Sequence, residues 1–132
     1  MSQQNVELVK QSIEALNRRD IDAFMALNTP DFELLPAMSG FAGVSFQGRE
    51  GVERYFAELA AVWEEFRVLG EDFRDLGDRV LVLMRIEGRG RGSGVTVVGR
   101  QAFISDFRDG KTARVRSYLD RADALRDAGL EE

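Results

Sequence analysis

The sequence contains no cysteine and no histidine. Without cysteine there is no disulfide framework, no thiolate nucleophile and no thiolate ligand for a metal. Without histidine the chain lacks the side chain that most often acts as a general base near neutral pH and as a metal ligand. We therefore expect no metal site and no bound cofactor.

The chain also lacks an excess of positive charge and any long apolar run. The chain has 18 lysines and arginines against 23 acidic residues, a net charge of −5 that argues against nucleic acid or an anionic membrane as a partner. No apolar run approaches the roughly 20 residues that span a bilayer. The polar start of the sequence lacks the basic-then-apolar order of a signal peptide. These features predict a cytoplasmic location.

The remaining composition is that of a folded globular protein. Of 132 residues, 44% are hydrophobic and 31% are charged, which is not the balance of a disordered chain. A chain of this length suits one domain, and we expect that domain to span residues 1–132.

Helical patterns fill the first half of the chain and strand patterns the second. Apolar residues spaced by three and four predict helices over 6–16, 21–27 and 52–66, with Asp20 as N-cap of the second. A turn at 29–31, a short strand at 32–35 and a small-residue loop at 37–48, which could fold inward as a lid, separate the last two. Further strands are predicted over 67–76, 80–87, 95–107 and 113–119, and a short helix over 122–128. This order predicts an α+β fold with an antiparallel sheet.

Three stretches resemble the SnoaL-like branch of the nuclear transport factor 2-like superfamily, a group that includes polyketide cyclases. They are residues 12–24, residues 48–56, and residues 107–111 followed by 117–122. The resemblance implies a cone-shaped, curved sheet wrapped by the three helices of the N-terminal half around one pocket. It does not assign an activity, because the fold hosts isomerases, cyclases, hydrolases and non-catalytic binders.

The positions that serve ketosteroid isomerase-like relatives carry other residues here. Those enzymes need a tyrosine on the first helix, a buried protonated aspartate and an aspartate base. The corresponding residues are Ser12, Phe103 and Leu35, and the last two can neither take nor give a proton. At Phe103 and Ser105, many relatives of the cyclase type carry histidine and tryptophan. The resemblance thus implies a more apolar pocket without an imidazole.

Limonene epoxide hydrolase-like relatives place an arginine and an aspartate two residues apart on a strand. Arg85 and Glu87 reproduce this spacing with glutamate for aspartate. Strand alternation puts both on one face, which we expect to be the pocket face, with Leu83 deeper on it. The second aspartate of these relatives falls at Ser117, and Glu33 could supply a second carboxylate instead. The alternative is that Arg85 and Glu87 form a half-exposed ion pair, which contributes roughly 0–1 kcal/mol.

Two functional hypotheses follow. In the first the protein is a cofactor-independent enzyme of isomerase, cyclase or epoxide-hydrolase type, with Glu87 as base, Arg85 as its orienting partner and Glu33 as second carboxylate. In the second it is a non-catalytic pocket for a small apolar molecule, or a scaffold with altered pocket chemistry. The predicted pocket-lining residues are Ser12, Leu35, Tyr55, Trp63, Leu83, Gln101, Phe103, Ser105 and Ser117.

The other face of the predicted sheet also carries apolar residues. They are Val82, Met84, Ile86, Ala102 and Ile104. A sheet that is apolar on both faces needs cover on both, and the helices cover one. We therefore predict a homodimer packed sheet to sheet.

Overall fold

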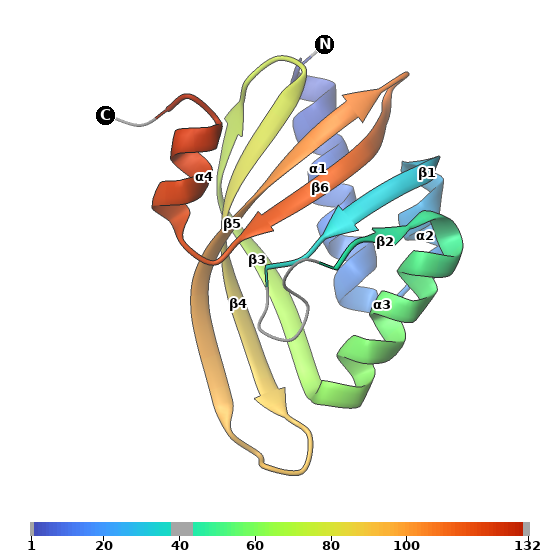
Figure 1. The fold of residues 1–132 in the computed structure, drawn as a ribbon, viewed down its shortest axis with the longest axis vertical. Coiled ribbons are helices and arrows are strands. Elements are labelled where there is room, and N and C mark those ends of the chain that lie inside the picture. The colour runs from blue at the N-terminus through green and yellow to red at the C-terminus, as the bar shows by residue number, and fades with distance from the viewer. Residues whose placement is uncertain (1, 38–43, 131–132) are drawn as a thin grey trace.

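Four helices and a six-stranded sheet make up the fold in the computed structural model, which describes residues 2–37 and 44–130 (Figure 1). The helices are α1 (Ser2–Arg18), α2 (Ile21–Ala26), α3 (Gly48–Val62) and α4 (Arg121–Asp127). The strands are β1 (Asn28–Leu35), β2 (Phe46–Gln47), β3 (Trp63–Asp75), β4 (Arg79–Gly90), β5 (Thr96–Arg108) and β6 (Lys111–Tyr118). Their order in the sheet is β2-β1-β6-β5-β4-β3. The predicted α+β class with a curved sheet is confirmed.

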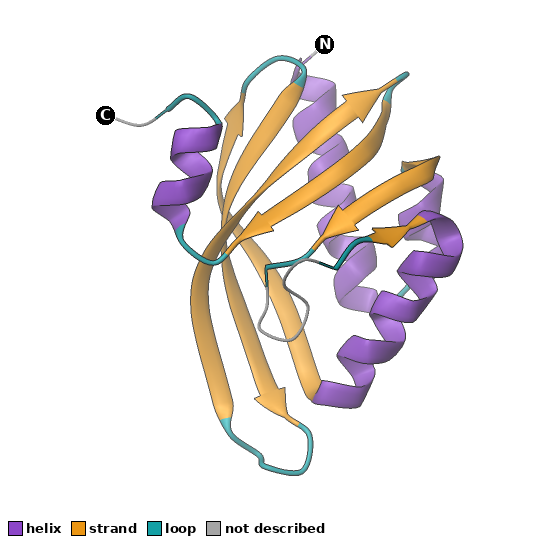
Figure 2. Ribbon diagram, in the orientation of Figure 1, coloured by secondary structure: helices purple, strands orange, loops and turns teal. Residues whose placement is uncertain are grey.

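The sheet is covered unequally on its two faces (Figure 2). Helices α1, α2 and α3 pack on one face and enclose the larger core, which includes Val9, Phe24 and Val52 from the helices and Phe103 from the sheet. Helix α4 packs on the other face, where Ala124 and Ala128 contact a smaller apolar cluster. No helix within 2–37 and 44–130 is long and apolar enough to cross a membrane.

The start of α2 follows the sequence pattern closely. Asp20 has an extended backbone, and its side chain accepts a hydrogen bond from the backbone N–H of Ala23 at 3.0 Å. This bond satisfies one of the N–H groups that the first helical turn leaves unpaired, so the predicted N-cap is confirmed.

Two parts of the predicted sheet are wrong. Strands β1 and β6 run parallel, because they are neighbours from opposite ends of the chain and no tight turn forces them to be antiparallel. Residues 46 and 47, expected in a loop, form β2 by pairing with Glu33 and Leu34, and Phe46 is buried. The expected lid residues from 38 to 43 lie outside the described residues.

The third helix ends at Val62, whereas its apolar spacing predicted an end near residue 66. Trp63 already belongs to β3 and pairs with Gly90 at the far end of β4. Pairing along the whole length of β4 therefore overrides the helical period of these residues. Strand β1 likewise begins earlier than predicted, at Asn28, which pairs with Thr112 of β6. It therefore runs through the Thr-Pro-Asp segment that was predicted as a turn.

The side chains of β4 point the opposite way from the prediction. Residues directly opposite each other on neighbouring strands share a face, and Val82 pairs with Phe103 while Met84 pairs with Gln101. Val82 and Met84 therefore face the helices, together with Ile86. Leu81, Leu83, Arg85 and Glu87 face outward. Alternation correctly predicts that Arg85 and Glu87 share a face, but β4 is apolar on both sides and so alternation could not tell which face is inside.

Candidate cavity site

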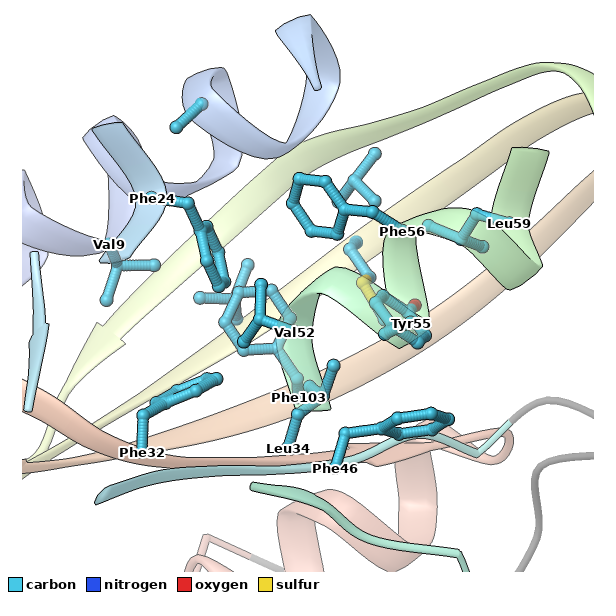
Figure 3. Packing of buried hydrophobic residues seen from close by; sticks show 14 of the residues in the cluster. Val9, Phe24, Phe32, Leu34, Phe46, Val52, Tyr55, Phe56, Leu59 and Phe103 are labelled. Carbon is cyan, nitrogen blue, oxygen red and sulfur yellow. The ribbon is translucent and has the colours of Figure 1, made fainter. Parts of the chain in front are cut away.

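A cavity lies between the sheet and the helices α1, α2 and α3. The volume that the centre of a water-sized sphere can occupy is about 80 Å³, several times the roughly 10–15 Å³ that one water needs. Figure 3 shows five of the lining side chains: Val9, Phe24, Leu34, Tyr55 and Phe103. They come from α1, α2, β1, α3 and β5, so the cavity depends on elements from the whole length of the fold.

The wall of the cavity is mainly aliphatic and aromatic. None of the lining residues within the described parts of the chain carries a charge, and the sequence of 38–43 contains no ionisable side chain. The apolar lining residues are Val9, Ile13, Leu16, Phe24, Leu34, Pro36, Ala37, Phe66, Val68, Met84, Ile86, Phe103 and Val115. Such a wall favours apolar molecules through burial of surface, at about 25 cal/mol per Å².

A few neutral polar groups interrupt this wall. Asn28 and Thr112 are 3% and 2% exposed and lie opposite each other where β1 and β6 begin. Neither end of the Asn28 amide has a hydrogen-bond partner within the described residues, and neither does the hydroxyl of Thr112. The same holds for the buried hydroxyl of Ser12 on α1. Buried polar groups are nearly always paired in folded proteins, so these three residues stand out in the cavity lining.

Tyr55 also lines the cavity. Burial raises the pKa of its phenol to about 12, and the nearby positive charge of Arg19 offsets part of this rise. The ring lies 5.3 Å from that of Phe46, centroid to centroid, with the two planes steeply inclined. The phenol is therefore neutral at physiological pH, when it can donate a hydrogen bond but is a poor base.

Six of the predicted pocket residues line the cavity and three do not. The six are Ser12, Tyr55, Gln101, Phe103, Ser105 and Ser117. Leu35 follows the lining residue Leu34 and points to the other side of β1, while Leu83 is packed in the smaller cluster under α4. Trp63 begins β3 and stacks near Phe66, with ring centroids 5.7 Å apart.

The expectation that Arg85 and Glu87 face the pocket is wrong. They form an ion pair on the outer face, with Arg85 Nη2 2.8 Å from Glu87 Oε2, and their side chains are 39% and 34% exposed. The other carboxylate oxygen of Glu87, Oε1, lies 3.7 Å from Arg67 Nη2. The arrangement is the half-exposed ion pair that the sequence left as the alternative.

Glu33 is separated from this pair by two intervening strands. Its carboxylate accepts a hydrogen bond from Ser45 Oγ at 2.8 Å and lies 3.5 Å from Arg114 Nε. The structure therefore does not bring Arg85, Glu87 and Glu33 together, and none of them is a lining residue of the cavity. These residues therefore do not form a catalytic site of the epoxide-hydrolase type.

Several cavity residues were missed by the sequence reasoning. Met84 and Ile86 would have been found if β4 had been given the opposite orientation. Asn28 carried no signal, because an asparagine before Thr-Pro-Asp is typical of an exposed turn. Thr112 follows a turn and belongs to a strand whose partner was unknown. Within the described residues, no group of three or more acidic side chains is placed to hold a metal ion.

Comparison with known proteins decides the family. Residues 9–115 match the SnoaL-like domain. The chain belongs to the SnoaL-like family. No match was found among curated protein sequences.

Solved structures resemble this SnoaL-like protein over nearly its whole length. An NTF2-like protein of unknown function from Burkholderia pseudomallei has 22% identity and a TM-score of 0.78, over 93% of this chain and 95% of that one. TerC, crystallised with polyporic acid, has 25% identity and a TM-score of 0.78, over 96% and 98%. A Jannaschia protein described as a SnoaL-like polyketide cyclase has 23% identity and a TM-score of 0.77, over 98% and 94%. These likenesses show a shared NTF2-like fold.

Proposed function

We propose that this SnoaL-like protein binds a small, largely apolar organic molecule in the cavity between its sheet and helices. The observation that carries the proposal is the lining itself, which is apolar, concave and uncharged, with a few neutral hydrogen-bonding groups. This is the usual make-up of small-molecule sites, in which apolar walls provide affinity and a few polar groups fix orientation.

Two structural relatives support a small-molecule ligand. TerC was crystallised with polyporic acid, and a protein of ketosteroid isomerase-like fold from Catenulispora acidiphila was crystallised with trimethylamine. The second relative is 20% identical to this chain, with a TM-score of 0.76. Both hold small organic molecules on a similar fold, which agrees with a ligand pocket here but does not name the ligand.

The cavity chemistry favours binding over catalysis by acid and base. A general base must lie within hydrogen-bond reach of the proton that it removes. The described lining offers hydroxyl, amide and phenol groups, which can polarise a carbonyl but cannot take a proton from carbon near neutral pH. The carboxylate of Glu87 lies on the other face of the sheet. We therefore place non-catalytic binding ahead of the enzyme hypothesis.

Filling the cavity tests the proposal. Ser117 lines the cavity beside Phe103, its partner on the neighbouring strand. Ser117→Phe therefore puts a ring into the space that a ligand would use. We expect the native chain to bind 4-fluorotoluene in ligand-observed ¹⁹F NMR and Ser117→Phe to lose that binding. Ser93→Phe is the matched control, because Ser93 lies in an exposed turn.

Equal binding by the native chain and Ser117→Phe contradicts the proposal. If Ser117→Phe fails to fold, backbone chemical shifts of the native chain with the probe give the answer. Shifts centred on Val9 and Phe103 support the cavity, whereas shifts confined to the outer face contradict it.

We also propose a homodimer through the outer face of the sheet. The corrected orientation of β4 turns Val82, Met84 and Ile86 inward and leaves Leu81 and Leu83 outside. Helix α4 covers much of that outer cluster, so the second copy would pack on the remaining sheet near Val98, a residue that is 61% exposed. The apolar area left for a second copy is thus smaller than the sequence indicated.

A further inference from the structure

We propose that Asn28 and Thr112 form the polar recognition point of the cavity and bind a neutral hydroxyl group on an otherwise apolar ligand. This inference rests on the proposed function, because it names the ligand chemistry of the same cavity. It goes beyond it by assigning the residues that select one class of small molecule from another.

The two residues are held rigidly side by side by the backbone. Asn28 is the first residue of β1, directly after the C-cap of α2 at Leu27. The N–H of Thr112 donates to the carbonyl of Leu27 at 3.0 Å, and Asn28 and Thr112 are partners in the parallel β1–β6 register. Two secondary-structure junctions therefore fix the positions from which both side chains reach the cavity wall.

Both side chains are more than nine-tenths buried, yet their polar atoms are unpaired within the described residues. Asn28 Oδ1 can accept and its Nδ2 can donate, while the hydroxyl of Thr112 can do either. Leaving such groups without partners is unfavourable in an apolar interior, and an aliphatic residue at either position would avoid the penalty. No described protein group takes up this hydrogen-bonding capacity, and both residues line the cavity.

The chemistry of the pair selects a neutral group that donates and accepts. An amide oxygen, an amide N–H and a hydroxyl match the hydroxyl of a phenol or an alcohol, which has one donor and two acceptor lone pairs. A carboxylate or an ammonium group fits poorly, because the described lining has no opposite charge to compensate its desolvation. Ser12 adds a further unpaired hydroxyl from α1 to the same cavity.

A matched pair of probes isolates this recognition. 4-Fluorophenol and 4-fluorotoluene differ by a hydroxyl in place of a methyl group of similar size, and ¹⁹F NMR titration gives both affinities. In Asn28→Leu and in Thr112→Val, we expect the ratio of phenol affinity to toluene affinity to fall by about three- to tenfold, as the loss of one neutral hydrogen bond predicts. Thr96→Val, which removes an exposed hydroxyl outside the cavity, should leave the ratio unchanged.

The melting temperatures of the unliganded variants add an independent readout. Neither substitution removes a hydrogen bond to a described side chain or backbone group, so Asn28→Leu and Thr112→Val should be no less stable than the native chain. A drop in stability together with an unchanged probe ratio would mean that these groups only hold a buried water, and would overturn the inference.

The outcomes also separate the inference from the proposed function. If both probes bind and no variant changes their ratio, recognition by Asn28 and Thr112 is refuted while the binding cavity stands. If the native chain binds neither probe, the proposed function and the inference fail together. A fall of the ratio in both cavity variants but not in Thr96→Val supports the assignment.

Discussion

Asn17 attaches helix α1 to the edge strand β3, and its replacement should measurably destabilise the protein. Its Nδ2 donates to the carbonyl of Val68 at 2.8 Å, and its Oδ1 accepts from the N–H of Val68 at 2.9 Å. Strand β3 is the last strand of the sheet, so this backbone has no neighbouring strand on its outer side. The side chain of Asn17 therefore satisfies the backbone groups of Val68 as a further strand would, and it blocks pairing of this edge with another chain.

The size of the effect follows from the two bonds. Each contributes about 0.5–1.5 kcal/mol net, so Asn17→Ala should lower the free energy of unfolding by roughly 1–3 kcal/mol. For a chain of this size that corresponds to a fall in melting temperature of roughly 4–12 °C. Asn17→Asp keeps the acceptor and loses the donor, so its effect should lie between those of the native chain and of alanine.

Thermal and urea unfolding followed by circular dichroism measure this loss. Asn5→Ala is the matched control on the same helix, because Asn5 makes one exposed bond, from its Nδ2 to the carbonyl of Gly77 at 3.1 Å. Its substitution should stay within about 0.5 kcal/mol. If Asn17→Ala destabilises the chain no more than Asn5→Ala, the two bonds do not hold the helix on the edge strand and the reasoning is refuted.

The remaining predictions concern charge, pH and assembly. Glu87→Gln should change the free energy of unfolding by less than about 1 kcal/mol and leave probe binding in the cavity intact, since the pair on the outer face is partly solvated; lost binding in the ¹⁹F assay would restore Glu87 to the site. Burial raises the pKa of Tyr55 to about 12 in the folded chain, against about 10 in the unfolded chain. The neutral phenol therefore contributes roughly 2–3 kcal/mol of stability below pH 10, and this contribution is lost as the pH rises from 10 towards 12. Urea unfolding between pH 9 and 11.5 should therefore show a steeper decline for the native chain than for Tyr55→Phe, and parallel curves would contradict the assignment. Sedimentation at tens of micromolar, a range chosen as typical for stable association, should show a dimer that Val98→Asp weakens, and a native monomer would refute the sheet-to-sheet pairing.

The architecture was predictable where a local pattern is unambiguous. The apolar spacing in α1 and the Asp20 N-cap of α2 are decided within a few residues, and both predictions hold. Pairing between distant segments was not predictable in the same way. The parallel contact of β1 with β6 and the early start of β3 at Trp63 depend on partners far along the chain, which no local period encodes.

The site shows the same limit at the level of single side chains. Phe103 and Ser105 line the cavity as predicted because the family resemblance placed them at pocket positions, and Gln101 does so because it shares their face of β5. From Val80 to Ile86 the apolar residues of β4 occupy both faces, so its inward side was fixed only by the pairing of Val82 with Phe103. One reversed strand moved Arg85 and Glu87 from the cavity to the outer face, and with them the expected catalytic pair.

The neutral lining and the unpaired amide together restrict the ionic form of any ligand. Transfer of an isolated charge from water into an apolar cavity is costly unless an opposite charge compensates it, and the described wall provides none. An ionisable ligand would therefore enter as its neutral form, and its apparent affinity would fall about tenfold for each pH unit beyond its own pKa, in the direction that charges it. A neutral phenol keeps its hydroxyl proton, so its O–H group can donate a hydrogen bond to the amide oxygen of Asn28. The uncharged wall and the hydroxyl recognition that we propose for Asn28 and Thr112 thus both favour the neutral form of the ligand.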